Sequence, residues 1–101
     1  MPNRVYTDLR RLRQDANDLI DRGQVRVHRH ARRSHPELTE VEQIGAVRYG
    51  GPIKADSERP KGDGVYVCWS RLPGRGLCRA VFCIEIGPTT DLVLVITAFE
   101  E

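Results

Sequence analysis

Three histidines and four arginines are crowded into one short segment of the chain, residues 25–35. Histidine exchanges protons near neutral pH, and the planar arginine fork can bind two phosphate oxygens at once. Together these types suit phosphodiester chemistry, which needs a base, an acid and a cation that stabilises charge on phosphorus. The segment supplies these candidates for proton transfer and phosphate contact: His28, His30, His35, Arg32 and Arg33.

The same residues also have ordinary structural roles. His28 and His30 alternate as they would on an exposed strand edge, and His35 precedes Pro36, as many turn residues do. The spacing of the three histidines, i, i+2 and i+7, suits no standard single-element metal site. We therefore expect no metal and no cofactor here.

Charge is unevenly distributed along the 101 residues, whose net charge is +2. Residues 1–35 hold nine arginines and four aspartates, for a net +5, whereas residues 36–64 and 65–101 carry −2 and −1. A basic N-terminal third indicates an anionic partner such as nucleic acid. A solvated helix face paired with acidic neighbours, or an acidic protein partner, would explain the same charge.

Length and composition indicate one soluble domain spanning residues 1–101, since 40% of the residues are hydrophobic and 30% charged. No apolar run approaches the roughly 18–20 residues of a membrane span, and the N-terminus lacks the apolar stretch of a signal peptide. The three cysteines lack C-x-x-C spacing and are expected to be buried, reduced thiols. The expected location is cytoplasmic, with no membrane partner.

An amphipathic helix is predicted at residues 3–22. Its apolar residues recur at spacings of three and four: Val5, Leu9, Leu12, Ala16, Leu19 and Ile20. Asn3 or Thr7 is expected to cap its start, and Gly23 to end it in the left-handed conformation. This helix forms an addition, residues 1–24, to a core of residues 25–101.

Two shorter helices are predicted next. One begins near residues 30–34 and ends at residues 35–36, because the residue before a proline is driven out of the α region. The other follows Thr39 and Glu42, which have the spacing of a capping box, and stops at residues 50–52.

Strands are predicted at residues 65–71, 77–86 and 92–99, with residues 53–58 as a poor edge strand. Short turns between consecutive strands imply antiparallel pairing. The expected fold is therefore α+β, with N-terminal helices packed on one face of a three- to five-stranded antiparallel sheet.

Strand 77–86 has one purely apolar face, which should meet the helices, and one mixed face that includes Arg79. Alternation in the last strand assigns Thr97 to a face with Val93, Val95 and Phe99. We expect pairing of these strands to bring Arg79 and Thr97 together on the less apolar face. There Arg79 would complete a phosphate clamp and Thr97 would bond a phosphate oxygen, with Glu85 as an alternative base.

The order of motifs is familiar: His30-Ala31-x-Arg33 at a helix start, a short capped helix at 39–47, and a final strand Leu94-Val95-Ile96-Thr97-Ala98-Phe99. It resembles a family of small, mostly uncharacterised bacterial proteins with a His-Ala-x-x-Arg helix start and a final Val-Ile-Thr-Ala-Tyr strand. That family is grouped with RelE-like toxins and the barnase/colicin/RelE type of fold. The resemblance covers residues 25–100. Here the arginine follows sooner, and Phe99 replaces the common tyrosine.

The resemblance implies a helix packed on a four-stranded sheet and, in some relatives, RNA cleavage without metal. With the chemistry above, it singles out four catalytic candidates, His30, Arg33, Arg79 and Thr97. Four further arginines are candidates for RNA binding: Arg26, Arg29, Arg32 and Arg71.

Two functions stay open. The first is a RelE-like toxin, or a relative of one, that acts as a metal-independent ribonuclease. The alternative is a non-catalytic RNA- or protein-binding module on the same fold, so whether the chain is an enzyme is undecided. Candidate partners are RNA, including ribosome-bound mRNA, an antitoxin protein, and a second copy of the chain.

Overall fold

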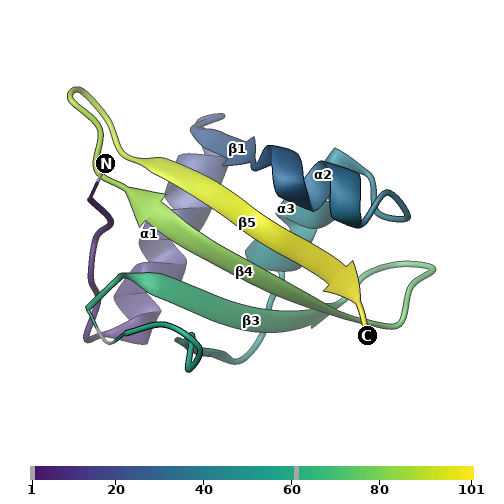
Figure 1. Cartoon of the computed structure of the whole chain (residues 1–101). Coiled ribbons are helices and arrows are strands. Elements are labelled where there is room, and N and C mark those ends of the chain that lie inside the picture. The colour runs from purple at the N-terminus through teal and green to yellow at the C-terminus, as the bar shows by residue number, and fades with distance from the viewer. Residues whose placement is uncertain (1, 61) are drawn as a thin grey trace.

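The computed structural model describes residues 2–60 and 62–101, and its helices and strands form an α+β arrangement (Figure 1). A mixed five-stranded sheet has the strand order β1-β5-β4-β3-β2. The elements are α1 (Leu9–Asp21), β1 (Val25–Val27), α2 (Arg29–Ser34), α3 (Glu40–Arg48), β2 (Ile53–Ala55), β3 (Val65–Arg71), β4 (Leu77–Glu85) and β5 (Leu92–Glu100).

The sheet is antiparallel from β2 to β5, as the short turns predict, but β1 runs parallel to β5. The prediction of a wholly antiparallel sheet was therefore wrong at this edge. A parallel neighbour needs a long connection, and the chain between β1 and β5 contains most of the domain. No local turn in the sequence indicates such a parallel pairing.

The first helix starts later than predicted, at Leu9, and Asp8 caps it by accepting a hydrogen bond from the Arg10 amide at 3.0 Å. Asn3 and Thr7 are not its caps. Asn3 instead forms a bridge opposite Glu85, and the Arg4 amide donates to a β4 carbonyl. These backbone bonds hold the N-terminal segment extended beside the sheet. The predicted end is confirmed, since Gly23 has a φ of +76°.

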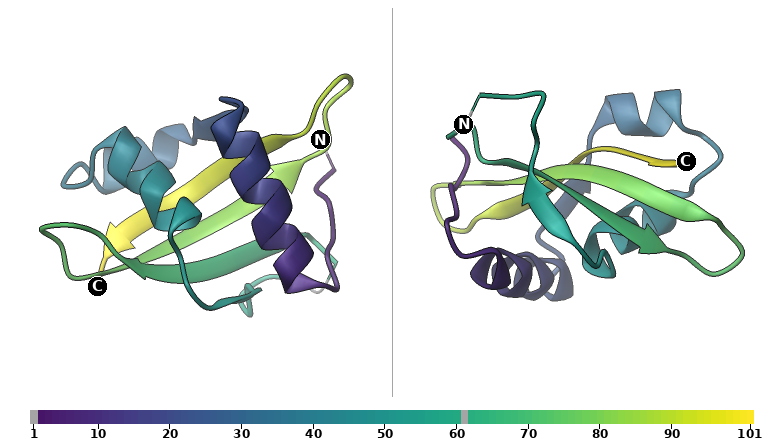
Figure 2. Two further views of the ribbon diagram at one scale, coloured as in Figure 1. Left: turned by 180° about the vertical axis from the view of Figure 1, so that it is seen from behind. Right: turned by 90° about the horizontal axis from the view of Figure 1, so that it is seen from below.

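Helices α1 and α3 cover one face of the sheet, which we call the inner face (Figure 2). The capping box of α3 is confirmed, because Thr39 and Glu42 exchange side chain–backbone hydrogen bonds at 3.0 and 3.1 Å. The largest buried side chains of this layer include Phe82, Leu12, Ile84 and Val47. The even-numbered face of β4 meets the helices, as its apolar pattern predicts.

Helix α2 lies along the edge of β5 (Figures 1 and 2). Strand β1 pairs only with residues 93–95 of β5, so the rest of that edge is left for α2. Ala31 is fully buried in the inner core, whereas His35, directly after the helix, stacks on Phe99 of β5. The prediction of all helices on one face is thereby corrected.

A register shift interrupts the pairing of β4 with β5. Val81 pairs with Thr97 but Phe82 pairs with Val95, so Ile96 is an extra residue. Beyond it, Ala98 joins the inner face with Val93 and Val95. Strict alternation, which grouped Ala98 with Leu94, was therefore wrong in the second half of β5.

Candidate functional site

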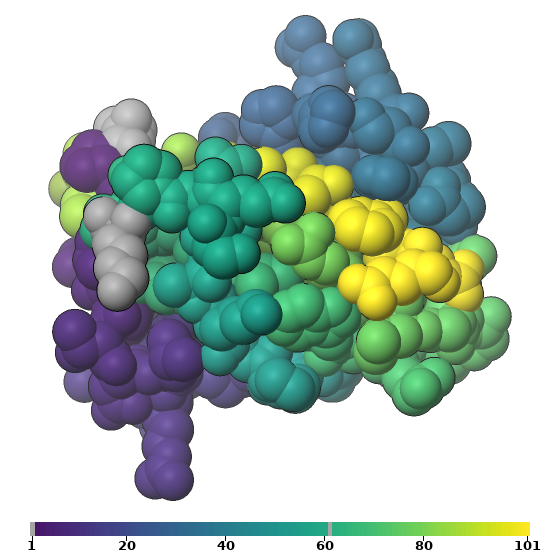
Figure 3. Space-filling view, turned by 60° about the horizontal axis from the view of Figure 1, so that its bottom comes forward, coloured from purple at the N-terminus to yellow at the C-terminus, as the bar shows by residue number. Residues whose placement is uncertain are grey.

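The outer face of the sheet, opposite α1 and α3, is covered at one end only. Val65, Val67, Val81 and Cys83 form a small buried cluster there. Burial raises the pKa of the Cys83 thiol to about 11, and the nearby Arg59 opposes this rise. Arg59 belongs to the connection between β2 and β3, which stands over this end (Figure 3). In the same view β5 lies open between that connection and α2.

Cations and aromatic rings alternate across the open end of this face. Trp69, Arg79 and Phe99 are aligned on adjacent strands by the pairing register. The Arg79 Cζ lies 5.9 Å from the centre of the Phe99 ring. At the β2 side, the Lys54 Nζ lies 5.2 Å from the centre of the Trp69 ring. We call Lys54, Trp69, Arg79, Phe99 and His35 the aromatic–cation row.

His35 forms the far end of the row and comes from a different layer. Its imidazole stacks on the Phe99 ring, with centres 5.0 Å apart and planes inclined by 26°. The His35 Nδ1 also lies 3.5 Å from a carboxylate oxygen of Glu37. One phenyl ring thus contacts both an imidazole and a guanidinium, which are two side-chain types that bind phosphate.

The charge of the row is only partly balanced. Among the described residues, Arg79 forms no ion pair, and Lys54 forms none either. The Trp69 Nε1 donates to a Glu101 carboxylate at 3.1 Å. A half-buried arginine without a carboxylate partner is available to an external anion.

Local sequence chemistry explains why His35 stands where it does. The His28 imidazole caps α2 by accepting the backbone N–H of His30 at 3.0 Å. Pro36, which has no amide hydrogen, stops the helix at its other end. His35 therefore leaves the helical conformation, with φ −133° and ψ 63°, and its ring stacks on Phe99 of β5.

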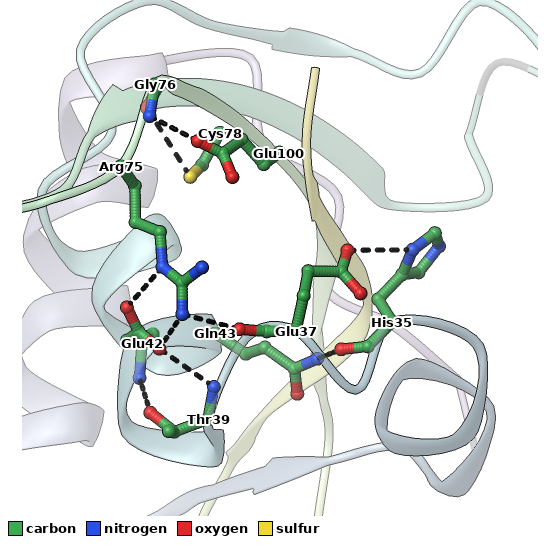
Figure 4. Close-up of polar contacts among 9 residues, drawn as sticks. All are labelled: His35, Glu37, Thr39, Glu42, Gln43, Arg75, Gly76, Cys78 and Glu100. Carbon is green, nitrogen blue, oxygen red and sulfur yellow. Dashed lines mark hydrogen bonds and ion pairs between the residues drawn. The ribbon is translucent and has the colours of Figure 1, made fainter.

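A polar network supports the segment that follows His35 (Figure 4). The Arg75 guanidinium donates to both Glu42 carboxylate oxygens, at 2.9 and 3.1 Å, and to the Glu37 carbonyl at 2.5 Å. Arg75 lies between β3 and β4, so this contact joins that hairpin to the start of α3. The Arg75 contact and the Thr39 amide lower the pKa of Glu42 from 4.5 to about 2.

Acid should weaken this network in a defined range of pH. Because the folded pKa of Glu42 is lowered, its contribution to stability is fully present above pH 4.5 and is lost as the pH falls towards 2. Urea unfolding at a series of pH values should show the stability gap between wild type and Glu42→Gln closing over that interval. Glu58→Gln is the control, because Glu58 is exposed and forms no ion pair with any residue that the structure describes. A gap that stays constant from pH 6 to 3 would contradict the prediction.

The four candidate catalytic residues are distributed over three elements, α2, β4 and β5. Arg79 and Thr97 lie on the outer face with one residue pair between them, because Arg79 pairs with Phe99 and Val81 with Thr97. His30 and Arg33 are exposed on α2, where the His30 ring contacts the Ser34 hydroxyl at 3.3 Å. Among the residues that the structure describes, no hydrogen bond or ion pair links His30 or Arg33 to Arg79.

The four candidate RNA-binding arginines are equally divided. Arg26 and Arg71 are on the outer face, and Arg26 lies 3.6 Å from Glu85. Arg29 and Arg32 are exposed on α2, with Arg32 3.8 Å from Glu40. Arg71 is exposed and follows Trp69 by two residues, so it flanks the aromatic–cation row.

Sequence reasoning weighed His35 both as a candidate for proton transfer and as a turn residue, and it selected neither Trp69 nor Lys54 as a site residue. The mixed, odd-numbered face of β4 and the aromatic Phe99 in β5 were signals in the sequence from which this surface could have been predicted. The place of His35 depends on α2 packing along the β5 edge, for which the sequence offers no local signal.

A polar hollow lies elsewhere in the molecule, between the N-terminal segment and α1. There Arg4 bonds Asp91, the Tyr6 hydroxyl donates to Asp15 at 2.8 Å, and Arg11 contacts Asp15 at 3.2 Å. Burial, with the bond to Asp15, raises the pKa of Tyr6. These charges neutralise one another, which makes the hollow a weaker candidate than the row.

Comparisons of the chain with protein-family models, with curated proteins and with solved structures found no match. Within the part of the chain that the structure describes, no three His, Cys, Asp or Glu side chains are grouped so as to hold a metal ion. No helix of that part is both long enough and apolar enough to cross a bilayer. The geometry of the row is therefore the basis for a functional proposal.

Proposed function

We propose that the open end of the outer face binds single-stranded RNA. The observation that carries the proposal is the aromatic–cation row. Aromatic side chains stack with bases whatever their sequence, while neighbouring cations bind the phosphates. Trp69 and Phe99 are two strands apart, roughly 10 Å, which leaves space for Arg79 between them.

Metal-independent cleavage of that RNA is the second candidate, and the sharing of Phe99 by His35 and Arg79 favours it. Histidine can take the 2′-hydroxyl proton as the 2′-oxygen bonds to phosphorus, and arginine can stabilise the phosphorane charge. The bond from phosphorus to the 5′-oxygen then breaks as that oxygen takes a proton from the protonated histidine or from water. Thr97, on the same face, would bond a phosphate oxygen. His30 and Arg33 remain the proposed alternatives for proton transfer and phosphate contact on α2.

A RelE-like role is part of this proposal rather than a separate one. Ribosome-bound mRNA offers single-stranded RNA, so it is a suitable substrate for the row. An antitoxin protein would act by covering this face. Both partners are proposed from the resemblance of residues 25–100, and the aromatic–cation row supports only the RNA component.

Arg79→Ala should weaken binding of a fluorescein-labelled single-stranded RNA by roughly 10- to 100-fold, the effect of losing one charge-assisted contact. The slope of log Kd against log salt should also fall by about 0.7, as for one lost phosphate contact on a single strand. Fluorescence anisotropy measures both. Arg10→Ala removes the same charge from the exposed side of α1 and should leave Kd within about two-fold. Equal losses in both variants would show that binding reflects overall charge only.

The cleavage candidate is decided on the same RNA, incubated in EDTA and resolved on a denaturing gel. Cutting by the wild type that is lost in His35→Ala but kept in His30→Ala would place proton transfer at the row. The reverse pattern would place it on α2. Binding without cutting, on free RNA and on ribosomes, would identify a non-catalytic RNA-binding module.

A further inference from the structure

A buried amide supports the turn that carries His35. Gln43 of α3 is completely buried, and its Nε2 donates to the Ala31 carbonyl at 3.1 Å and to the His35 carbonyl at 3.4 Å (Figure 4). Both amide hydrogens of the side chain are therefore used on one turn of α2. The Gln43 Oε1 is buried and has no partner among the described residues.

Both carbonyls already accept a backbone hydrogen bond. Ala31 receives the His35 amide at 3.2 Å, and His35 receives the Leu38 amide at 3.3 Å. The carbonyls at the end of a helix are the ones that lack intrahelical donors, and Pro36 removes one more donor here. Gln43 thus adds a second donor at each end of the segment 31–35. These two points determine the course of its backbone.

A polar side chain in this position has no other evident use. The neighbours of Gln43 on the inner side of α3, Ala46 and Val47, are apolar and fully buried. An amide with one unpaired buried oxygen is unfavourable in such surroundings unless its donors are needed. The needed contact is the one with the α2 turn, because that is where both N–H groups point.

We propose that Gln43 is a positioning residue for the RNA site: it holds the backbone of residues 31–35 so that the His35 imidazole stacks on Phe99. The proposal rests on the proposed function for its consequence in RNA binding. Its structural part, the link from α3 to the His35 ring, stands on the hydrogen bonds alone. The core helix thereby sets one end of the aromatic–cation row.

Gln43→Met tests this, because methionine has a similar volume and no donor. In NMR spectra of the free wild type, the His35 ring protons should carry an upfield shift from the Phe99 ring, and Gln43→Met should remove most of it. Affinity for the labelled single-stranded RNA should fall about 3- to 10-fold. Val47→Ala, a buried change on the same helix, should leave the His35 shift and the affinity unchanged at a temperature where both variants are folded.

A double-mutant cycle separates positioning from general damage. In a His35→Ala background, Gln43→Met should cause no further loss of RNA affinity. An equal loss in both backgrounds, or a wild-type His35 shift in Gln43→Met, would overturn the proposal. If Gln43→Met does not fold, Gln43→Asn, one methylene shorter, makes the same comparison. Wild type that fails to bind RNA would overturn the proposed function, and the NMR comparison would still decide the positioning role.

Discussion

Replacing Phe99 by alanine is expected to weaken binding of a single-stranded RNA by roughly 10- to 100-fold. A base–aromatic stack contributes about 1–3 kcal/mol per base when tested by alanine substitution. The centre of the Phe99 ring also lies 5.0 Å from that of the His35 ring and 5.9 Å from the Arg79 Cζ. Removal of the ring therefore deprives both side chains of the surface on which they pack. Anisotropy with labelled RNA measures the change.

Leu94→Ala is the matched control for this prediction. Leu94 is also a partly buried side chain of β5 on the outer face, but it packs against the buried cluster at the covered end of that face, which includes Val65 and Cys83. Its loss should cost some stability and leave the affinity within about two-fold. Equal effects of Phe99→Ala and Leu94→Ala would mean that the row has no special part in RNA binding.

Phe82→Ala should have the largest effect on stability, lowering the free energy of unfolding by about 3–5 kcal/mol. Phe82 is completely buried at the centre of β4, and its ring lies 6.3 Å from that of Tyr66. A domain of this size has a total stability of about 5–15 kcal/mol, so the variant should be close to the unfolding threshold. Urea denaturation followed by circular dichroism gives the difference.

Val41→Ala serves as the comparison because Val41 is 80% exposed on α3. It should change the free energy of unfolding by less than about 0.5 kcal/mol. A cost below 1 kcal/mol for Phe82→Ala would contradict the packing of β4 described above.

Several elements were predictable because their determinants are local. Thr39 and Glu42 are three residues apart and cap α3 as their spacing predicts. Gly23 ends α1 with the positive φ that favours glycine. The strand at 65–71 has the predicted bounds, since glycine and proline turns delimit a β-rich run. Each depends on residues within one turn or one strand.

Other predictions were wrong where a distant partner decides. The residues expected to begin the first helix are held by β4, because backbone bonds at Asn3 and Arg4 compete with helix formation. The faces of β5 change at Ile96, because the bulge depends on how β4 and β5 meet. Neither contact has a pattern in the sequence around it.

The candidate site shows the same division. The sequence by itself determined the chemical types, with histidine and arginine in residues 25–35 and Arg79 on a mixed strand face, whereas the bulge at Ile96 brings Thr97 to that face. The sequence also indicated that residues 35–36 end a helix. Only the tertiary structure decided which histidine contacts the same ring as Arg79. That residue is His35, because α2 packs along the β5 edge left free by β1, Gln43 donates to the His35 carbonyl, and the His35 ring stacks on Phe99. Such a meeting of three separate elements depends on packing, which no local spacing encodes.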